Sequence, residues 1–152
     1  GVIWLKRCLI SRNSFTCGER CSVRGARFSV EMRIERFEEI EAWMVARELT
    51  RGVYRLVKTS NLKNDYALRD QLTRAAGSVM HNIAEGFDGG SNAEFSRFLQ
   101  YAKRSCSEVQ SQLYIAVDQG YCEPSRFDEL YEQARLARSK IGAFIKYLNK
   151  PK

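Results

Sequence analysis

The sequence contains few of the residues that interrupt helices, and none of its apolar runs is long. It has two prolines and ten glycines in 152 residues, which excludes collagen-like, proline-rich and low-complexity chains and argues against a turn-rich all-β fold. No apolar run approaches the roughly 18 to 20 residues that a membrane-spanning helix needs. The length suits one domain, and apolar residues at 44% with charged residues at 28% are typical of a globular protein.

The chain has a single histidine, which limits the chemistry it can support. A histidine-based metal site and the Glu-x-x-His pairs of di-iron bundles are excluded. Ser78, His81 and Glu85 contain the three chemistries of a hydrolytic triad, but on one straight helix they would point in parallel, with no strained turn or oxyanion hole beside them. The sequence therefore predicts no catalytic residue, no metal and no cofactor.

Positive charge and cysteine are concentrated at the start of the chain. The net charge is +7, and residues 1–31 hold six lysines and arginines against two acids, with three of the five cysteines. This segment lacks a sustained period, and its Cys17 and Cys21 pair has no second pair to complete a zinc site. We expect residues 1–34 to be an N-terminal extension that is disordered or lies upstream of the true start, with Met32 as the candidate start. Alternating apolar residues over 28–34 leave a short strand open, and an organelle transit peptide is a weaker alternative.

Beyond residue 34, apolar residues recur at three- and four-residue steps in four long segments. A Ser91 to Glu94 capping box begins the third segment, and Pro124 begins the fourth. Gly86 and Gly120 are expected to end the second and third. Short connections place successive helices antiparallel, so the sequence predicts an all-α protein, an up-down-up-down four-helix bundle over residues 35–149.

Two motifs in the middle of the chain are similar to a known family. Residues 71–86 (QLTRAAGSVMHNIAEG) and 94–108 (EFSRFLQYAKRSCSE) resemble successive motifs of the four-helix bundle proteins encoded in intervening sequences of bacterial 23S ribosomal RNA genes. Residues 37–43 (FEEIEAW) and the Gly-Tyr pair at 120–121 fit the start and the third loop of that family. The resemblance covers about residues 35–149.

The resemblance implies several properties of this chain. It implies a bacterial protein that forms a ring-like homo-oligomer, most simply a pentamer, with no enzymatic activity. Separately, reduced cysteines and the absence of a targeting signal favour a cytoplasmic location. The resemblance also implies a relation to the accessory protein of diversity-generating retroelements, a similar bundle thought to bind nucleic acid and a reverse transcriptase. RNA, DNA or a nucleic-acid enzyme are therefore the expected partners beside a second copy of the chain.

The motifs place polar side chains in a stripe beside each apolar stripe. The motif residues with a predicted role in assembly are Gln71, Arg74, Ser78, Asn82, Glu85, Gly86, Glu94, Arg97 and Glu108. We expect Arg97 near Glu85, and Arg74 near Glu108 or Arg104, as pairs that set the register of a subunit interface. Direct RNA contact by the stripe, or simple capping of the backbone around Gly86, remain alternatives.

Basic residues recur on the first and fourth predicted helices. The nucleic-acid-binding candidates are Arg47, Arg51, Arg55 and Lys58 on the first helix and Arg135, Arg138, Lys146 and Lys150 on the fourth. Because the first and last helices of such a bundle are neighbours, the two sets are expected to merge. The main hypothesis is an oligomeric bundle that associates with RNA or ribonucleoprotein through these basic faces. The alternative is a protein-interaction or scaffolding module, such as a partner of a reverse transcriptase, with no direct nucleic-acid role.

The two remaining cysteines carry separate expectations. Cys106 lies on the apolar face of the third predicted helix, so we expect it to be a small buried apolar residue. Cys122 lies in a predicted loop, where partial exposure is expected.

Overall fold

The structure, a computed structural model, describes residues 3–6 and 31–150. The described residues fall into two compact units that divide between Glu35 and Arg36. The first is small and contains two strands, and the second contains all four long helices.

The first unit is a two-stranded antiparallel sheet. β1 (Ile3–Lys6) pairs with β2 (Glu31–Ile34), with Ile3 opposite Ile34 and Lys6 opposite Glu31. The strand left open for 28–34 is present over its described part, Glu31–Ile34, and β1 lies near the other end of the predicted extension. The partner strand was missed because strands so far apart in the chain leave no hairpin turn signal. Residues 7–30, with Cys17 and Cys21, lie outside the described residues.

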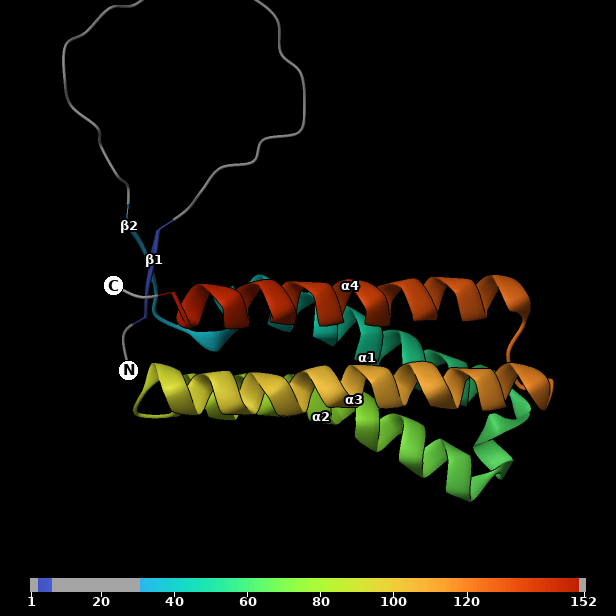
Figure 1. Ribbon diagram of the computed structural model, residues 1–152. Coiled ribbons are helices and arrows are strands. Elements are labelled where there is room, and N and C mark those ends of the chain that lie inside the picture. The colour runs from blue at the N-terminus through green and yellow to red at the C-terminus, as the bar shows by residue number, and fades with distance from the viewer. Residues whose placement is uncertain (1–2, 7–30, 151–152) are drawn as a thin grey trace, which may run out of the picture. The chain divides into compact units, whose positions relative to one another are not determined.

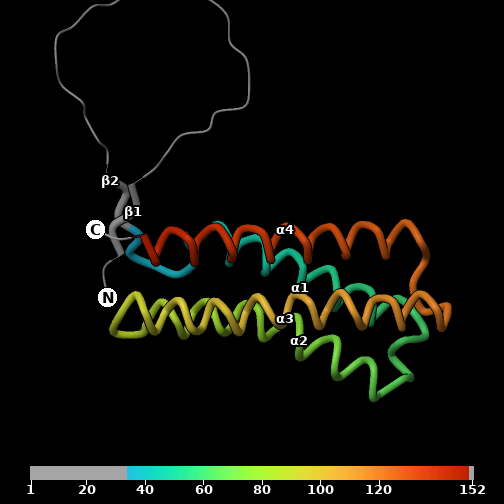
Figure 2. The backbone as a smooth tube through the Cα atoms, in the orientation of Figure 1, coloured from blue at the N-terminus to red at the C-terminus, as the bar shows by residue number. Residues whose placement is uncertain are grey.

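The second unit is the four-helix bundle that the periodicity predicted. Two short 3-10 helices, η1 (Phe37–Glu39) and η2 (Asn61–Asn64), precede α1 and α2. The long helices are α1 (Glu41–Thr59), α2 (Tyr66–Asp88), α3 (Asn92–Asp118) and α4 (Pro124–Leu148). Each packs against the helix before or after it, and α4 also packs against α1. The turn between α2 and α3 lies at the opposite end from the other two connections (Figures 1 and 2).

The helix ends are capped by side chains and backbone, largely as the sequence predicts. The Asp65 carboxylate accepts a hydrogen bond from the Leu68 N–H at 3.0 Å and caps α2. Ser91 Oγ accepts from the Glu94 N–H at 3.2 Å, while the Glu94 carboxylate accepts from the Gly90 N–H at 3.3 Å, one residue before the position a capping box predicts. Gly120 follows α3 with φ of 69°, a conformation that glycine adopts without strain.

The sequence predicted that Gly86 ends the second helix, but it does not. It is buried inside α2, which continues to Asp88. A Cβ added at Gly86 would lie 2.6 Å from Phe95 Cδ2 and 2.7 Å from Phe98 Cβ. The absent side chain therefore lets α2 and α3 approach closely just before the turn that joins them.

The two cysteine thiols of the bundle are both buried. Cys106 is fully inaccessible, as expected, but Cys122 is 4% exposed and belongs to the core cluster at its end of the bundle, so the predicted partial exposure is wrong. The loop that carries Cys122 folds inward because Leu130 and Leu113 pack around this end. Burial raises the pKa of the Cys106 thiol to about 12.

The Cys106 thiol should therefore resist modification. We expect a disulfide reagent at pH 8 to modify it at least about 10³-fold more slowly than in unfolded chain, because exposure needs an opening that costs several kcal/mol. The rate is measured on a chain whose other four cysteines are replaced by alanine. The folded state favours the protonated thiol, so this stabilising contribution is complete below pH 9 and is lost as the pH rises toward about 12. Rapid native-state modification would contradict the burial.

Candidate functional site

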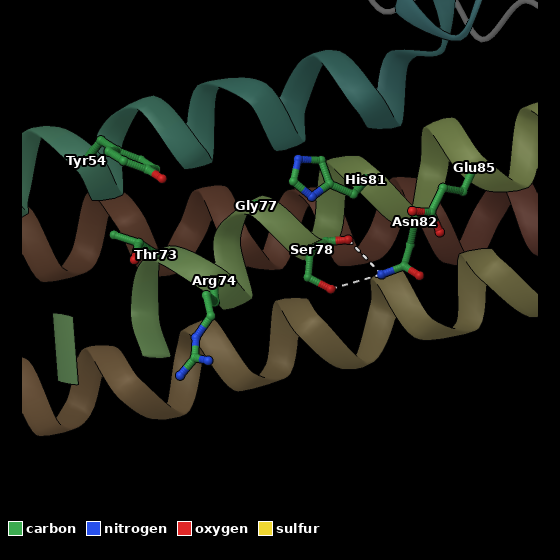
Figure 3. Close-up of a pocket in the computed structure, with 8 residues that line it drawn as sticks. All are labelled: Tyr54, Thr73, Arg74, Gly77, Ser78, His81, Asn82 and Glu85. Atoms are coloured by element: carbon green, nitrogen blue, oxygen red, sulfur yellow. Dashed lines mark hydrogen bonds between the residues drawn. The ribbon is translucent and has the colours of Figure 1, made fainter. Parts of the chain in front are cut away.

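The polar stripes of α2 and α3 meet at the groove between the two helices. Ser105 Oγ of α3 donates a hydrogen bond to Ser78 Oγ of α2 at 3.0 Å. Sequence periodicity placed these two serines on separate stripes and could not show that they meet. The Asn82 amide donates to the Ser78 hydroxyl at 2.9 Å and to its carbonyl at 2.7 Å. Figure 3 shows both Asn82 bonds, within one turn of α2. The motif serines and the asparagine thus satisfy each other and fix the register of α2 on α3.

An open pocket of about 430 Å³ lies on the outer side of this stripe. Its lining comes from α2, except for one side chain from α1 (Figure 3). The lining residues are Tyr54, Thr73, Arg74, Gly77, Ser78, His81, Asn82 and Glu85. The pocket is wide and polar, and Gly77 forms its floor, where the nearest atom to an added Cβ is His81 Cε1 at 3.6 Å.

The predicted ion pairs between α2 and α3 are not formed among the described residues. Arg97 pairs instead with Glu94 of its own helix, at 3.7 Å. Arg74 donates to the Asp70 carbonyl at 3.2 Å. The hydrogen bond between Ser105 and Ser78, and not a pair of buried charges, therefore joins these stripes. Gln71 and Glu108 are exposed, and Glu108 accepts a hydrogen bond from the Gln112 amide at 3.2 Å.

The Ser78, His81 and Glu85 set is not arranged as a triad. Within residues 31–150, no hydrogen bond joins Ser78 to His81 or His81 to Glu85, and the Ser78 hydroxyl bonds to Asn82 and Ser105. The same residues contain no group of three or more histidine, cysteine or acidic side chains placed to hold a metal ion. None of the helices described here has the length and apolar character to cross a membrane.

The basic residues predicted on α1 are all exposed. Arg51 forms an ion pair with Glu48 at 2.9 Å, and the Arg47 guanidinium lies over the Trp43 ring at 5.8 Å. Arg55 and Lys58 complete the set toward the end of the helix. No acidic residue follows Glu48 before Asp65, so this end of α1 is positively charged.

The α1 and α4 basic sets do not merge, contrary to the prediction. α4 runs antiparallel to α1, so Lys140 reaches Glu41 at 2.6 Å while Arg126 reaches the Gly52 carbonyl at 3.0 Å. The basic half of α4 therefore lies beside the beginning of α1, away from Arg55 and the basic end of that helix. The two helices are neighbours, as predicted, but their antiparallel direction keeps the two basic sets apart.

The basic half of α4 lies instead beside the first half of α3. Ser96 Oγ donates to Asn149 Oδ1 at 3.0 Å, and the Phe95 and Phe144 rings are 5.2 Å apart. Neither residues 95–107 of α3 nor residues 133–150, which comprise the second part of α4 and the two residues after it, include an aspartate or glutamate. Together they form what we call the acid-free face.

The acid-free face contains eight lysines and arginines. They are Arg97, Lys103, Arg104, Arg135, Arg138, Lys140, Lys146 and Lys150. All except the half-buried Lys103 and Lys140 are exposed. Lys103, Arg104 and Lys140 were missed as candidates, and Arg97 was predicted only for assembly. The signal that identifies them is the absence of acidic residues in two segments that pack antiparallel.

Carboxylates outside the two segments pair with three of the bases: Glu94 with Arg97, Glu41 with Lys140, and Glu132 with Arg135. Arg135 forms an ion pair with Glu132 at 2.6 Å, and its hydrogen bond holds the pKa of that carboxyl below its usual range. Both groups are fully exposed, so this pair is weak and water competes with it. The arrangement can attract an extended anion along the two helices, and it offers no enclosed cavity for a small one.

Comparisons with known proteins support the fold. The family model described as 23S rRNA-intervening sequence protein matches residues 38–143. A crystal structure from Bacteroides thetaiotaomicron, described as a protein with unknown function from the S23 ribosomal protein family, aligns with a TM-score of 0.63 and 18% identity, covering 69% of this chain and 98% of that one. No curated protein matches the chain. The matched residues lie within the bundle unit and include all but the last part of the acid-free face.

Proposed function

Because the chain belongs to the 23S rRNA-intervening sequence protein family, we propose that it is a non-enzymatic protein that binds RNA or a ribonucleoprotein through its acid-free face. The observation that carries the proposal is the alignment of two segments without a single acidic residue and with six exposed bases. Phosphate contacts need positive side chains that water can reach, and a nearby carboxylate weakens each contact. All six exposed bases meet the first condition. Arg104, Arg138, Lys146 and Lys150 also meet the second, because no ion pair joins them to a carboxylate among the described residues, whereas Arg97 and Arg135 are paired. Residues 133–148 of α4 extend over about 24 Å, at 1.5 Å per residue for 16 residues.

The α1 set provides a second, weaker basic surface. Two of its four members are already engaged, Arg51 by Glu48 and Arg47 by the Trp43 ring. We propose that it contributes to long-range attraction and to contacts with a bent or large RNA. The net charge of residues 32–152 is only +3, so the position of the bases matters more than their total.

We further propose that the protein acts as a homo-oligomer, with the polar groove of α2 and α3 as the subunit contact. The open pocket and the neighbouring exposed Tyr54 and Tyr101 lie on this side of the bundle and leave side chains for a second copy to meet. A ring would repeat the acid-free face around its axis and multiply weak contacts with one RNA. Free buried thiols are compatible with a reducing cytoplasm, which we propose as the compartment.

Neutralising the acid-free face should weaken RNA binding. We expect the triple replacement of Arg135, Arg138 and Lys146 by glutamine to lower the slope of log affinity against log salt by about 3, because each of these positive side chains neutralises about one phosphate. Binding of the full chain to a labelled RNA hairpin is measured by fluorescence anisotropy from 20 to 300 mM salt. The comparison variant carries glutamine at Arg47, Arg51 and Arg55, and a smaller reduction is expected.

Light scattering accompanies the titration as a control. Neither triple variant should change the molar mass, because the replaced side chains lie outside the α2 and α3 groove. An unchanged chain that fails to bind RNA even at 20 mM salt would contradict RNA binding. If that chain is still an oligomer, the protein-interaction or scaffolding role becomes the better proposal.

A further inference from the structure

Three aromatic rings cluster where α3 and α4 meet, at the end of the acid-free face. Tyr114 of α3 lies 4.9 Å from Phe127 and 5.7 Å from Tyr131 of α4, measured between ring centroids. Phe127 and Tyr131 are stacked, with 5.4 Å between centroids and 30° between planes. Phe127 and Tyr131 belong to the apolar stripe of the fourth helix, whereas Tyr114 lies off the apolar stripe of the third.

All three rings of the cluster are partly exposed to solvent. Tyr114 exposes 51% of its surface, and Phe127 and Tyr131 are only half-buried. The neighbouring Tyr131 phenol raises the pKa of Tyr114. The rings are therefore supported from behind by their neighbours while an aromatic surface faces solvent, which gives a rigid platform instead of mobile side chains.

Charges of both signs surround the cluster, and the bases lie toward the acid-free face. Arg135 follows Tyr131 by one helical turn, and Arg138 follows by two, so the platform continues into the acid-free face. Asp118 follows Tyr114 by one turn of α3, and Asp128 lies between Phe127 and Tyr131 in α4. Glu132 directly follows Tyr131 and pairs with Arg135 at 2.6 Å. A negatively charged chain that ends or turns at the platform is favoured over one that continues past it.

We propose that Tyr114, Phe127 and Tyr131 stack with unpaired bases of an RNA whose phosphates follow the acid-free face. This inference rests on the proposed function and deepens it, because it names RNA with a single-stranded segment as the partner. Bases within an A-form duplex are already stacked on each other and hide their faces, whereas unpaired bases present faces that an aromatic ring can cover. Stacking on aromatic side chains tolerates any base, so the platform requires no sequence specificity.

Two RNA probes with equal numbers of nucleotides test the platform. A labelled 12-nucleotide oligouridine and a labelled six-base-pair duplex are titrated with the full chain at low salt. The Tyr114→Leu and Tyr131→Leu variants should each bind the oligouridine about tenfold more weakly, the scale of one base stacked on one ring, and bind the duplex within twofold of the unchanged chain. Tyr114→Phe keeps the ring and should retain oligouridine affinity within about twofold.

Tyr66→Leu is the matched control. Tyr66 is 68% exposed and lies against Arg69 near the start of α2, away from the acid-free face, so its replacement should change neither affinity. Circular dichroism melting confirms that each variant is folded. Equal weakening for both probes, no weakening for either, or a full tenfold weakening in Tyr114→Phe would overturn the platform while leaving RNA binding itself supported. Failure of the unchanged chain to bind either probe would overturn both the platform and the proposed function.

Discussion

Replacing Phe95 by alanine is expected to lower the free energy of unfolding by about 3–5 kcal/mol, the range for a large aromatic side chain removed from a core. Phe95 is 1% exposed and is among the largest fully buried side chains of the bundle. Its ring makes edge-to-face contacts with Phe87 of α2 at 6.3 Å and with Phe144 of α4 at 5.2 Å. One side chain therefore connects three helices, and its removal leaves a cavity that no single helix can close.

Urea unfolding followed by circular dichroism measures this effect. The midpoint should fall while the slope against urea concentration stays the same, which shows that stability and not the extent of unfolding has changed. Phe98→Ala is the matched control, since Phe98 lies one turn further along α3 and is only half-buried. A destabilisation by Phe98→Ala as large as that by Phe95→Ala would contradict the assignment of Phe95 as the central residue at this end of the bundle.

Replacing Gly86 by alanine is the second large expected effect, a destabilisation of about 1–3 kcal/mol from overpacking. The new methyl carbon would lie 2.6 Å from the Phe95 ring and 2.7 Å from Phe98 Cβ. Phe98 Cβ is attached directly to the α3 backbone, so α3 itself must move, and the short turn that follows α2 leaves little room for that movement. The destabilisation is net of the gain in helix propensity, which is at most about 1 kcal/mol for glycine to alanine in a helix interior.

Gly77→Ala separates the two contributions in the same helix. The nearest atom to its added Cβ is 3.6 Å away, an ordinary contact, so only the propensity gain remains and stability should rise by about 0.5–1 kcal/mol. Gly142→Ala in α4, with nothing within 4 Å, should behave in the same way. Thermal melting of all three variants gives the order of their stabilities directly. A Gly86→Ala protein as stable as Gly77→Ala would rule out the close approach of α2 and α3.

The helices could be predicted from the sequence because their cause is local. Apolar residues at three- and four-residue steps specify a buried face, and Asp65, Ser91 and Pro124 mark helix starts through bonds or backbone angles within one turn. The same locality explains the errors at Gly86 and Cys122. A glycine near the end of a pattern usually ends a helix, and a cysteine in a loop is usually accessible, so only the packing of other segments against them could show otherwise.

For the candidate sites too, the sequence predicts some features and only the structure shows the others. Which residues are basic and which helix carries each of them is evident from the sequence, and all eight basic candidates on α1 and α4 are exposed. How these residues group on the surface is not evident from the sequence, because it depends on the direction in which α4 runs past α1 and α3. That direction separates Arg55 from Lys146 and brings Lys103 and Arg104 to the side of Arg138.

The sequence by itself determined the fold class, the family and the residues available for assembly and for nucleic-acid contact, because periodicity, capping and motifs are properties of neighbouring residues. Only the tertiary structure decided that the serine stripes bond to each other, that the predicted ion pairs are replaced by local ones, and that two acid-free segments form one surface with an aromatic cluster at its end. These outcomes depend on register and rotation between helices. Many weak contacts along the whole bundle set those quantities together, and no single segment encodes them.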